Sequence, residues 1–326
     1  MLRRALFGVG FGAVLYAAVV LAADAGRLRD ALRSFAGAQL LWALLLSTGN
    51  YALRFAKWEL CLGWLGVRRP GPGNAPELGA ARSALIYLSG LAMSVTPGKL
   101  GEVLRSVLLK SSDGVSGSRT APIVVADRLS DLVALVILSL LGIAGHSELW
   151  PVVLGTLALV LGAVVALGTP ALLSRAIALV ARAGLPGIAT RAEALVASSA
   201  ALLRLRPLAL LTALSVLGWG LECAGYWCVL RGFAGVDPDL AQSAFLWSST
   251  TLIGAVSFLP GGLGATEGSL AVLAARLVPG IDGATALAST LLIRAATLWY
   301  AVLLGSVALA LFLRDPELRR RSLESA

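Results

Sequence analysis

The chain has 326 residues, of which 58% are hydrophobic and only 14% are charged, and its formal net charge is +9. About a quarter of the residues of soluble proteins are charged, so this composition excludes an ordinary soluble domain. The mean hydropathy of +0.85 and repeated apolar runs of about 20 residues predict a polytopic helical membrane protein. Basic loops also set membrane orientation, so the positive charge does not indicate nucleic-acid binding.

Eight apolar segments follow one another along the chain: 5–23, 38–65, 83–109, 120–143, 149–168, 207–231, 240–278 and 284–313. The first has the features of a signal peptide, but it is nearly long enough to span, and we predict that it stays uncleaved. The stretch 169–206 is too interrupted to span. Its Arg175 and Arg182 share one helical face, so we predict a cytoplasmic amphipathic connector. The whole chain, 1–326, is then one transmembrane domain with a cytoplasmic tail at 314–326.

Two of these segments are interrupted by a related motif, SVTPGKLGE at Ser94–Glu102 and SFLPGGLGATE at Ser257–Glu267. Proline and glycine break a helix in mid-run, and the freed backbone groups must be buried in protein or face water. The arms of segment 83–109 have about a dozen residues each, too few to cross about 30 Å of hydrocarbon. The predicted fold class is therefore all-α: a transmembrane helix bundle of about six full spans plus two broken or re-entrant helical hairpins. Ordinary proline kinks are the alternative.

The distribution of basic residues tests this topology. With the N-terminus inside and both interrupted segments re-entrant, about 16 basic residues lie inside and about 5 outside, in agreement with the positive-inside rule. The two motifs then enter from opposite faces, as in an inverted repeat around a central site. An arrangement in which both segments span fully fits only slightly worse and stays open. We predict a multi-pass inner-membrane protein with both termini in the cytoplasm.

Charged residues inside the apolar segments mark the candidate site. Each charge at mid-bilayer costs about 2.5–3.5 kcal/mol, so such residues by default line a cavity, pair with one another, or both. Spacings of three or four place three pairs each on one helical face: Arg54 with Lys57, Glu102 with Arg105, and Asp127 with Asp131. Basic residues outnumber acidic ones in the cytoplasmic half, which suits an anionic head group. The predicted substrate path comprises Arg54, Lys57, Pro97, Gly98, Lys99, Glu102, Arg105, Asp127, Arg128, Asp131, Glu222, Pro260, Gly261, Gly264, Glu267 and Arg294.

Plainer interpretations of some of these residues stay open. Arg54 and Lys57 can extend toward the inner interface and keep their charges in water. Asp127, Arg128 and Asp131 can form a structural ion-pair cluster that locks helices together.

The cysteines carry no chemistry of their own in this interpretation. Cys61, Cys223 and Cys228 lie in apolar runs without paired spacing, so we predict packing residues, not disulfides or metal ligands. We expect no metal and no other cofactor.

At four places the sequence resembles the lysylphosphatidylglycerol synthase transmembrane-region family, also called flippase-like membrane proteins. The matching pieces are PGKLGEVLRSVLL (Pro97–Leu109), ADRLSDL (Ala126–Leu132), PGGLGATEGSL (Pro260–Leu270) and Arg294 in the last apolar segment. The resemblance covers almost the whole chain. It implies an inner-membrane domain that moves aminoacylated phosphatidylglycerol, other lipids or lipid-linked glycans between leaflets. It also implies functional roles for Lys99, Glu102, Arg105, Asp127, Arg128, Glu267 and Arg294.

The sequence departs from the bifunctional members of this family in one respect. Those members append a soluble aminoacyl-transferase domain, whereas this chain stops shortly after its last apolar segment. We therefore expect that it does not make lysyl-lipid itself. Its expected partners are membrane lipids and a lipid-synthesising enzyme encoded separately.

Together these observations favour a lipid translocase without an intrinsic ATPase, because the sequence has no GxxxxGK[ST] loop. Transport then runs downhill or is coupled to ions or protons, with Glu102, Glu222 and Glu267 as candidate proton carriers. An intramembrane phosphatase or transferase is the first alternative. Against it, His146 falls in a predicted outer loop, and neither a catalytic motif nor metal-ligand spacing is present. A small-solute transporter is the second alternative.

Overall fold

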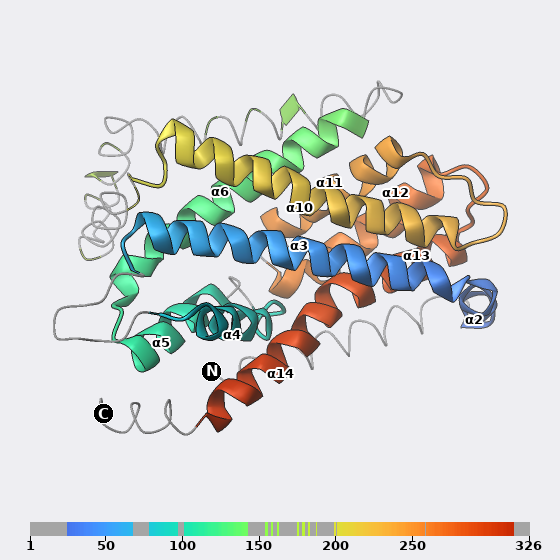
Figure 1. Cartoon of the computed structure of the whole chain (residues 1–326). Helices are drawn as coiled ribbons and strands as arrows, with labels where there is room; N and C mark the ends of the chain where they lie inside the picture. Colours follow the sequence, from blue (N-terminus) through green and yellow to red (C-terminus); the bar gives the residue numbers. More distant parts are fainter. Residues whose placement is uncertain are drawn as a thin grey trace.

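The computed structural model describes residues 25–67, 78–96, 101–142, 201–257 and 259–315, with isolated positions between 154 and 199. Every regular element within these ranges is helical (Figure 1). The α-helices are α2 (Ala25–Ser34), α3 (Gly37–Trp64), α4 (Ala80–Leu91), α5 (Gly101–Asp113), α6 (Gly117–Gly142), α10 (Leu205–Arg231), α11 (Leu240–Val256), α12 (Ala265–Leu277), α13 (Gly283–Arg294) and α14 (Tyr300–Arg314). A 3₁₀ turn, Pro260–Gly262, precedes α12, and a π-helical turn, Ala295–Trp299, joins α13 to α14.

The predicted apolar segments correspond closely to these helices. Segments 38–65, 120–143 and 207–231 are α3, α6 and α10, and segment 284–313 is the continuous run from α13 to α14. Both interrupted segments are divided into two helices, as their Pro-Gly motifs predict. Segments 5–23 and 149–168, the connector 169–206 and the tail 314–326 lie wholly or mostly outside the described residues.

Two described helices, Leu205–Arg231 and Gly283–Arg314, are long and apolar enough to cross a membrane by composition alone. Helix α3 has 28 residues and α6 has 26, which is also sufficient length at 1.5 Å per residue. These two helices carry the charged residues of the candidate site, which makes them less apolar. Their charges must therefore be satisfied inside the protein.

Helices α3 and α10 form the central frame and run antiparallel. Asn50 of α3 contacts Glu222 of α10, and seven residues further along α3, Lys57 contacts Ser215, seven residues earlier in α10. Figure 1 shows α3 and α10 side by side across the molecule, with α6 beside them. The two ends of this frame are called below the Gly37 end and the Trp64 end of α3.

Helices α4 and α5 form the first hairpin, at the Trp64 end. Arg105 of α5 donates to the carbonyl of Tyr87 in α4, and a Cβ atom on Gly101 would collide with the Gly90 carbonyl. The two helices therefore run antiparallel in close contact. Helix α4 begins beside Trp58, whose indole donates to Ser83 at 3.1 Å. Its far end points toward the middle of α3.

Helices α11 and α12 form the second hairpin, at the Gly37 end. Gln242 of α11 donates to the carbonyl of Leu277 in α12 at 2.7 Å, and Gly254 lies directly against Thr266. The hairpin opens near the C-terminal end of α10, where the Trp227 indole donates to Pro238. The two hairpins thus open at opposite ends of the α3–α10 frame.

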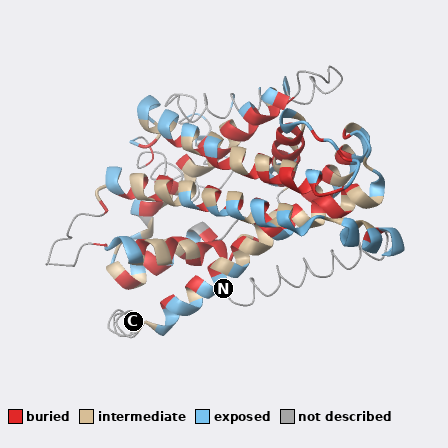
Figure 2. Ribbon diagram, turned by 45° about the vertical axis from the view of Figure 1, so that its right-hand side comes forward, coloured by how far each residue is buried: buried red, intermediate tan, exposed pale blue. Residues whose placement is uncertain are grey.

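Buried apolar side chains form two large clusters, one in each half of the frame. The first includes Phe233, Phe245 and Trp247 toward the Gly37 end, and the second includes Leu62 and Leu109 toward the Trp64 end. Burial is concentrated where helices face one another (Figure 2). The polar side chains of the candidate site lie where these two clusters approach each other.

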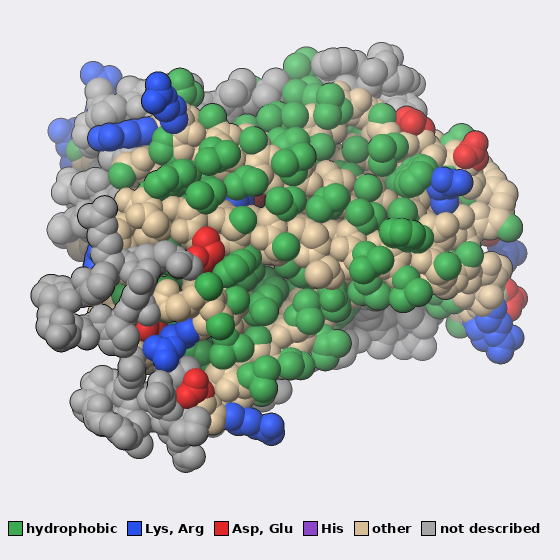
Figure 3. Space-filling model, in the orientation of Figure 1, with side chains coloured by type: hydrophobic (Ala, Val, Ile, Leu, Met, Phe, Trp, Pro, Cys, Tyr) green, Lys and Arg blue, Asp and Glu red, His purple; other side chains and the backbone are tan. Residues whose placement is uncertain are grey.

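The outer surface is apolar across its middle. In Figure 3 hydrophobic side chains cover the centre of the visible face, and most charged side chains gather at its two ends. Large exposed apolar residues lie on several outer helices, among them Leu41 and Leu45 of α3 and Leu303, Val307 and Leu311 of α14. An apolar band flanked by charge is the surface expected of a protein in lipid.

Helix α13 begins outside this apolar band with a side-chain cap. Asp282 Oδ1 accepts from the Thr285 backbone amide at 2.8 Å, and hydrogen bonds from Thr285 hold the pKa of Asp282 below its usual value. A depressed pKa means that the cap contributes stability above the unfolded value, about 3.9, and loses it as the pH falls through the folded value. We expect Asp282→Ala to cost about 1 kcal/mol at pH 7 and progressively less below about pH 4.

Thermal unfolding in detergent, at pH 7 and below about pH 4, measures how much stability the Asp282→Ala variant loses at each pH. Asp237→Ala is the matched control, because Asp237 is equally exposed and precedes Pro238 in the loop before α11. Equal melting temperatures of the Asp282 variant and the wild type at pH 7 would contradict the capping role.

Candidate functional site

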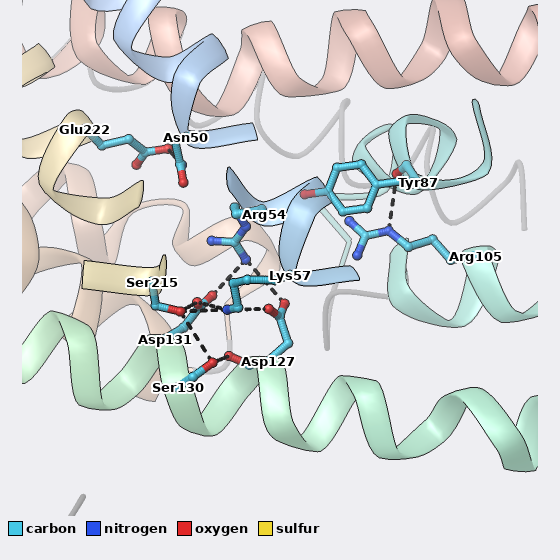
Figure 4. Close-up of polar contacts among 10 residues, drawn as sticks. All are labelled: Asn50, Arg54, Lys57, Tyr87, Arg105, Asp127, Ser130, Asp131, Ser215 and Glu222. Carbon is cyan, nitrogen blue, oxygen red and sulfur yellow. Dashed lines mark hydrogen bonds and ion pairs between the residues drawn. The ribbon is translucent and has the colours of Figure 1, made fainter. Parts of the chain in front are cut away.

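Four charged residues form a compact ion-pair cluster between α3, α6 and α10 (Figure 4). Lys57 Nζ lies 2.6 Å from Asp127 Oδ1 and 2.9 Å from Asp131 Oδ1, and it also donates to Ser215 Oγ at 2.6 Å. Arg54 Nη2 lies 2.8 Å from Asp131 Oδ2 and 3.6 Å from Asp127 Oδ2. No donor is aligned on Asp131 Oδ2 for a hydrogen bond, so Arg54 holds this oxygen by charge. The charges of the two cations and the two anions therefore sum to zero.

The cluster decides between the open interpretations of these residues. Lys57 is only 2% exposed, so the interpretation that Arg54 and Lys57 extend to the membrane interface is wrong. The predicted sharing of a helical face is confirmed for two of the three pairs: Arg54 and Lys57 on α3 face Asp127 and Asp131 on α6. The cluster joins three helices, as the structural interpretation of the two aspartates expects. Arg128, the next residue on α6, is partly buried and has its own contacts.

A small cavity, called below the Arg105 pocket, adjoins the cluster on the side of α5. Its lining includes Trp58, Cys61, Arg105, Ser106 and Thr120, together with Arg54, Lys57 and Asp127 of the cluster. Its volume is about 10 Å³, close to that needed for one water molecule. The hydroxyls of Ser106 and Thr120 lie 2.7 Å apart.

Arg105 has aromatic partners, whereas Arg54, Lys57 and Arg294 pair with carboxylates. Its guanidinium lies 4.1 Å from the centre of the Tyr87 ring and 5.9 Å from that of Trp58, and its Nε donates to the Tyr87 carbonyl at 3.2 Å. It makes no ion pair with any carboxylate in the described part of the chain. The Tyr87 hydroxyl is buried without a hydrogen-bond partner and points toward Arg54 in Figure 4. Arg105 therefore places beside the pocket a positive charge that no described carboxylate pairs with.

Glu222 lies further along α10, toward the Gly37 end. It is 5% exposed, and its carboxyl oxygens contact Asn50 Nδ2 at 2.5 Å and Trp247 Nε1 at 3.2 Å. The sequence pattern points to Glu222 but to neither of these partners. Asn50 had a detectable signal, because it precedes Arg54 by four residues and so shares its helical face.

The second Pro-Gly motif forms a tight turn stabilised by an ion pair. Gly261 and Gly264 have φ values of 61° and 86°, a region that favours glycine. Glu267 Oε2 accepts from the Gly264 amide at 2.7 Å, and Glu267 Oε1 lies 2.6 Å from Arg294 Nε. Arg294 also donates to the Gly261 carbonyl at 2.8 Å. These residues and Pro260, which starts the turn, form one unit at the tip of the second hairpin.

The tip of the second hairpin touches the first. A Cβ atom on Gly261 would lie 3.2 Å from Val95 Cα and 3.4 Å from the Ser94 carbonyl oxygen, with Leu298 of the π-helical turn 3.5 Å away. Ser94 and Val95 follow α4 and belong to the first motif. The two related motifs, more than 150 residues apart in sequence, therefore meet beside the π-helical turn, a feature that is frequent at functional sites.

The remaining predicted residues are only partly placed. Pro97, Gly98 and Lys99 lie outside the described residues, and Glu102 lies on α5 without a described side chain. The three cysteines are free and buried in helices, as predicted for packing residues. Among the described residues no three His, Cys, Asp or Glu side chains form a group suited to a metal ion.

Comparison with known proteins gives two matches. Residues 5–305 match the family described as lysylphosphatidylglycerol synthase TM region. A stretch of 100 residues is 32% identical to a UPF0104 membrane protein of Methanothermobacter thermautotrophicus, covering 31% of this chain and 29% of that protein. The match therefore spans less than a third of the relative's length. The family match covers most of the chain, including both hairpins and the ion-pair cluster, and the chain belongs to the lysylphosphatidylglycerol synthase TM region family of integral membrane proteins.

Proposed function

We propose that this protein moves lipids with an anionic or phosphate-bearing head group between the leaflets of the inner membrane, without hydrolysing nucleotide. The observation that carries the proposal is the guanidinium of Arg105 beside a pocket, held by aromatic rings and paired with none of the described carboxylates. A guanidinium is suited to phosphate recognition, since its planar set of donors matches the phosphate oxygens. The Ser106 and Thr120 hydroxyls supply further donors. Anionic phospholipids, aminoacylated phosphatidylglycerol and polyprenyl-phosphate glycans share the phosphate group.

The position of α5 favours a lipid over a small solute. Arg105 faces the pocket, whereas Val103 and Val107 on the same helix are 48% and 43% exposed. A single helix thus separates the pocket from the apolar surface that faces lipid. A head group can enter beside α5 while its acyl chains stay in the bilayer, a geometry that a water-soluble substrate does not need.

The hairpins suggest how the pocket opens. Its volume of about 10 Å³ is too small for a head group, so this arrangement is closed and substrate entry requires movement of a helix. We infer that the hairpins are re-entrant halves of an inverted repeat that alternately separate at their meeting point, Val95 and Gly261. In this proposal the Trp64 end and both termini are cytoplasmic.

We expect Arg105→Gln to slow the leaflet exchange of anionic lipid strongly. A hydrogen bond to a charged group contributes about 1.5–3 kcal/mol, which corresponds to a loss of about tenfold to a hundredfold. Arg105→Lys keeps the charge without the planar donor set, so its exchange rate should lie between those of the wild type and Arg105→Gln. The measurement uses liposomes with fluorescent phosphatidylglycerol, aminoacylated phosphatidylglycerol or phosphatidylcholine, and a reductant that bleaches only the outer leaflet.

Arg119→Gln is the matched control, because Arg119 is an exposed arginine near the same end, where it donates to the Leu65 and Gly66 carbonyls. It should exchange lipid like the wild type. If Arg105→Gln is fully active, Arg105 does not recognise the head group. Because phosphatidylcholine also carries a phosphate, equal exchange of phosphatidylcholine and phosphatidylglycerol would show that the net charge of the head group is not recognised. Conversion of the lipid to a new chemical species without exchange would favour the enzyme alternative.

A further inference from the structure

Glu222 is a buried carboxyl group without a counter-charge in contact. It forms no ion pair with any basic residue in the described ranges, and its two contacts are the Asn50 amide and the Trp247 indole. Asp127, Asp131 and Glu267 each pair with a cation at 2.6–2.9 Å. An ionised carboxylate buried without such a partner is strongly disfavoured, because the protein interior does not replace its hydration.

The cations that face Glu222 from the helices packed against α10 are already held in ion pairs. Helix α3 presents Arg54, which Asp131 and Asp127 hold, and Tyr51, which donates to the Thr297 carbonyl. Helix α6 presents these two aspartates, and α13 presents Arg294, which Glu267 holds. Helix α11 presents Trp247 and has no charged residue. On α10 itself the nearest titratable side chains are Cys223 and Tyr226, both neutral at pH 7. The two groups of cations near Glu222 are therefore each paired with other carboxylates.

The geometry at Asn50 fits a carboxyl group that carries a proton. The Asn50–Glu222 separation of 2.5 Å lies at the short limit of O–H···O bonds and below the range of N–H···O bonds. The two ends of an amide are assigned from their partners. With the amide reversed, Oδ1 faces Glu222 and accepts a hydrogen bond, provided that the carboxyl group supplies the proton.

We propose that Glu222 is a proton-binding site that couples lipid translocation to proton movement. In the closed arrangement the carboxyl group is neutral and donates to Asn50. When the hairpins part and water enters, Glu222 gives its proton to water and becomes a carboxylate. That carboxylate attracts Arg54, one helical turn from Asn50, away from Asp131 and so loosens the ion-pair cluster between α3 and α6. Proton uptake reverses each step. This coupling rests on the proposed lipid translocation.

Infrared spectroscopy of the purified full-length protein in lipid tests the proton site without any transport measurement. At pH 7 the wild type should show the carbonyl band of a neutral carboxylic acid. Glu222→Gln should lack this band, Asn50→Leu should shift it, and Asp237→Asn, which changes an exposed carboxyl, should leave it unchanged. Absence of the band in the wild type, or its persistence unchanged in both Glu222→Gln and Asn50→Leu, would overturn the proposal.

Liposomes with a pH gradient and a clamped membrane potential test the coupling. If one proton moves per lipid, a difference of one pH unit should drive fluorescent phosphatidylglycerol to about a tenfold leaflet asymmetry at steady state. Reversal of the gradient should reverse the asymmetry, and Glu222→Gln should give equal leaflets. Exchange by the wild type without asymmetry, or equal asymmetry in Glu222→Gln, refutes the coupling. Absence of any exchange refutes the proposed function instead, and the infrared band then decides whether Glu222 holds a proton.

Discussion

Replacement of Asp131 by asparagine is expected to destabilise the protein by about 3–5 kcal/mol, the usual cost of removing one partner from a buried ion pair. Asparagine has nearly the size of aspartate, so the loss does not come from a cavity. Lys57 is 2% exposed and cannot reach water, and Arg54 and Lys57 would be left with Asp127 alone. The apparent melting temperature in detergent and the yield of folded protein should both fall sharply.

Removal of the opposing cation should restore much of this loss. Lys57→Met keeps the aliphatic stem and removes the charge, so Lys57→Met/Asp131→Asn leaves one cation, Arg54, against one anion, Asp127. The double variant should therefore be more stable than Asp131→Asn alone, and a double-mutant cycle measures the coupling. Additive losses in the cycle would show that the two side chains do not depend on each other. The ion-pair cluster would then not be what joins α3 to α6.

The helices themselves were largely predictable from the sequence. Apolar runs and Pro-Gly interruptions locate α3, α6, α10 and both hairpins within a few residues, because helix formation in a membrane is dictated by local hydrophobicity and by breaks in backbone hydrogen bonding. The exact ends of the helices were less predictable from the sequence. Helix α4 ends at Leu91, six residues before Pro97, and a run of turns follows it.

The pairing of charges was not predictable to the same degree. Spacing of three or four residues shows that Asp127 and Asp131 share a face, but it does not show which helix that face meets. An excess of basic residues in one half suggested a positively charged pocket that binds anionic head groups. The structure shows Arg54, Lys57, Asp127 and Asp131 as a neutral cluster, with Arg105 nearby against aromatic rings. Which cation keeps its charge available depends on tertiary contacts between helices distant in sequence.

Glu267→Gln is expected to destabilise the protein strongly, although the sequence alone suggests a carboxylate that faces a substrate path. Glu267 lies 2.6 Å from Arg294 Nε, and Arg294 is 7% exposed. Glutamine can still accept from the Gly264 amide but cannot balance the guanidinium, so about 3–5 kcal/mol should be lost. Because Arg294 also holds the Gly261 carbonyl, the tip of the second hairpin should loosen where it meets Val95.

The decisive comparison pairs this variant with Glu267→Gln/Arg294→Gln, which removes both charges. If the ion pair is structural, the double variant should be the more stable of the two, and lipid exchange should fall in proportion to the amount of folded protein. Arg294→Gln alone should be as damaging as Glu267→Gln, since it leaves the carboxylate buried without its cation. The opposite result would be Glu267→Gln protein with a wild-type melting temperature and no lipid exchange. That outcome would place the carboxylate on the substrate path, because only a role in transport then accounts for the loss.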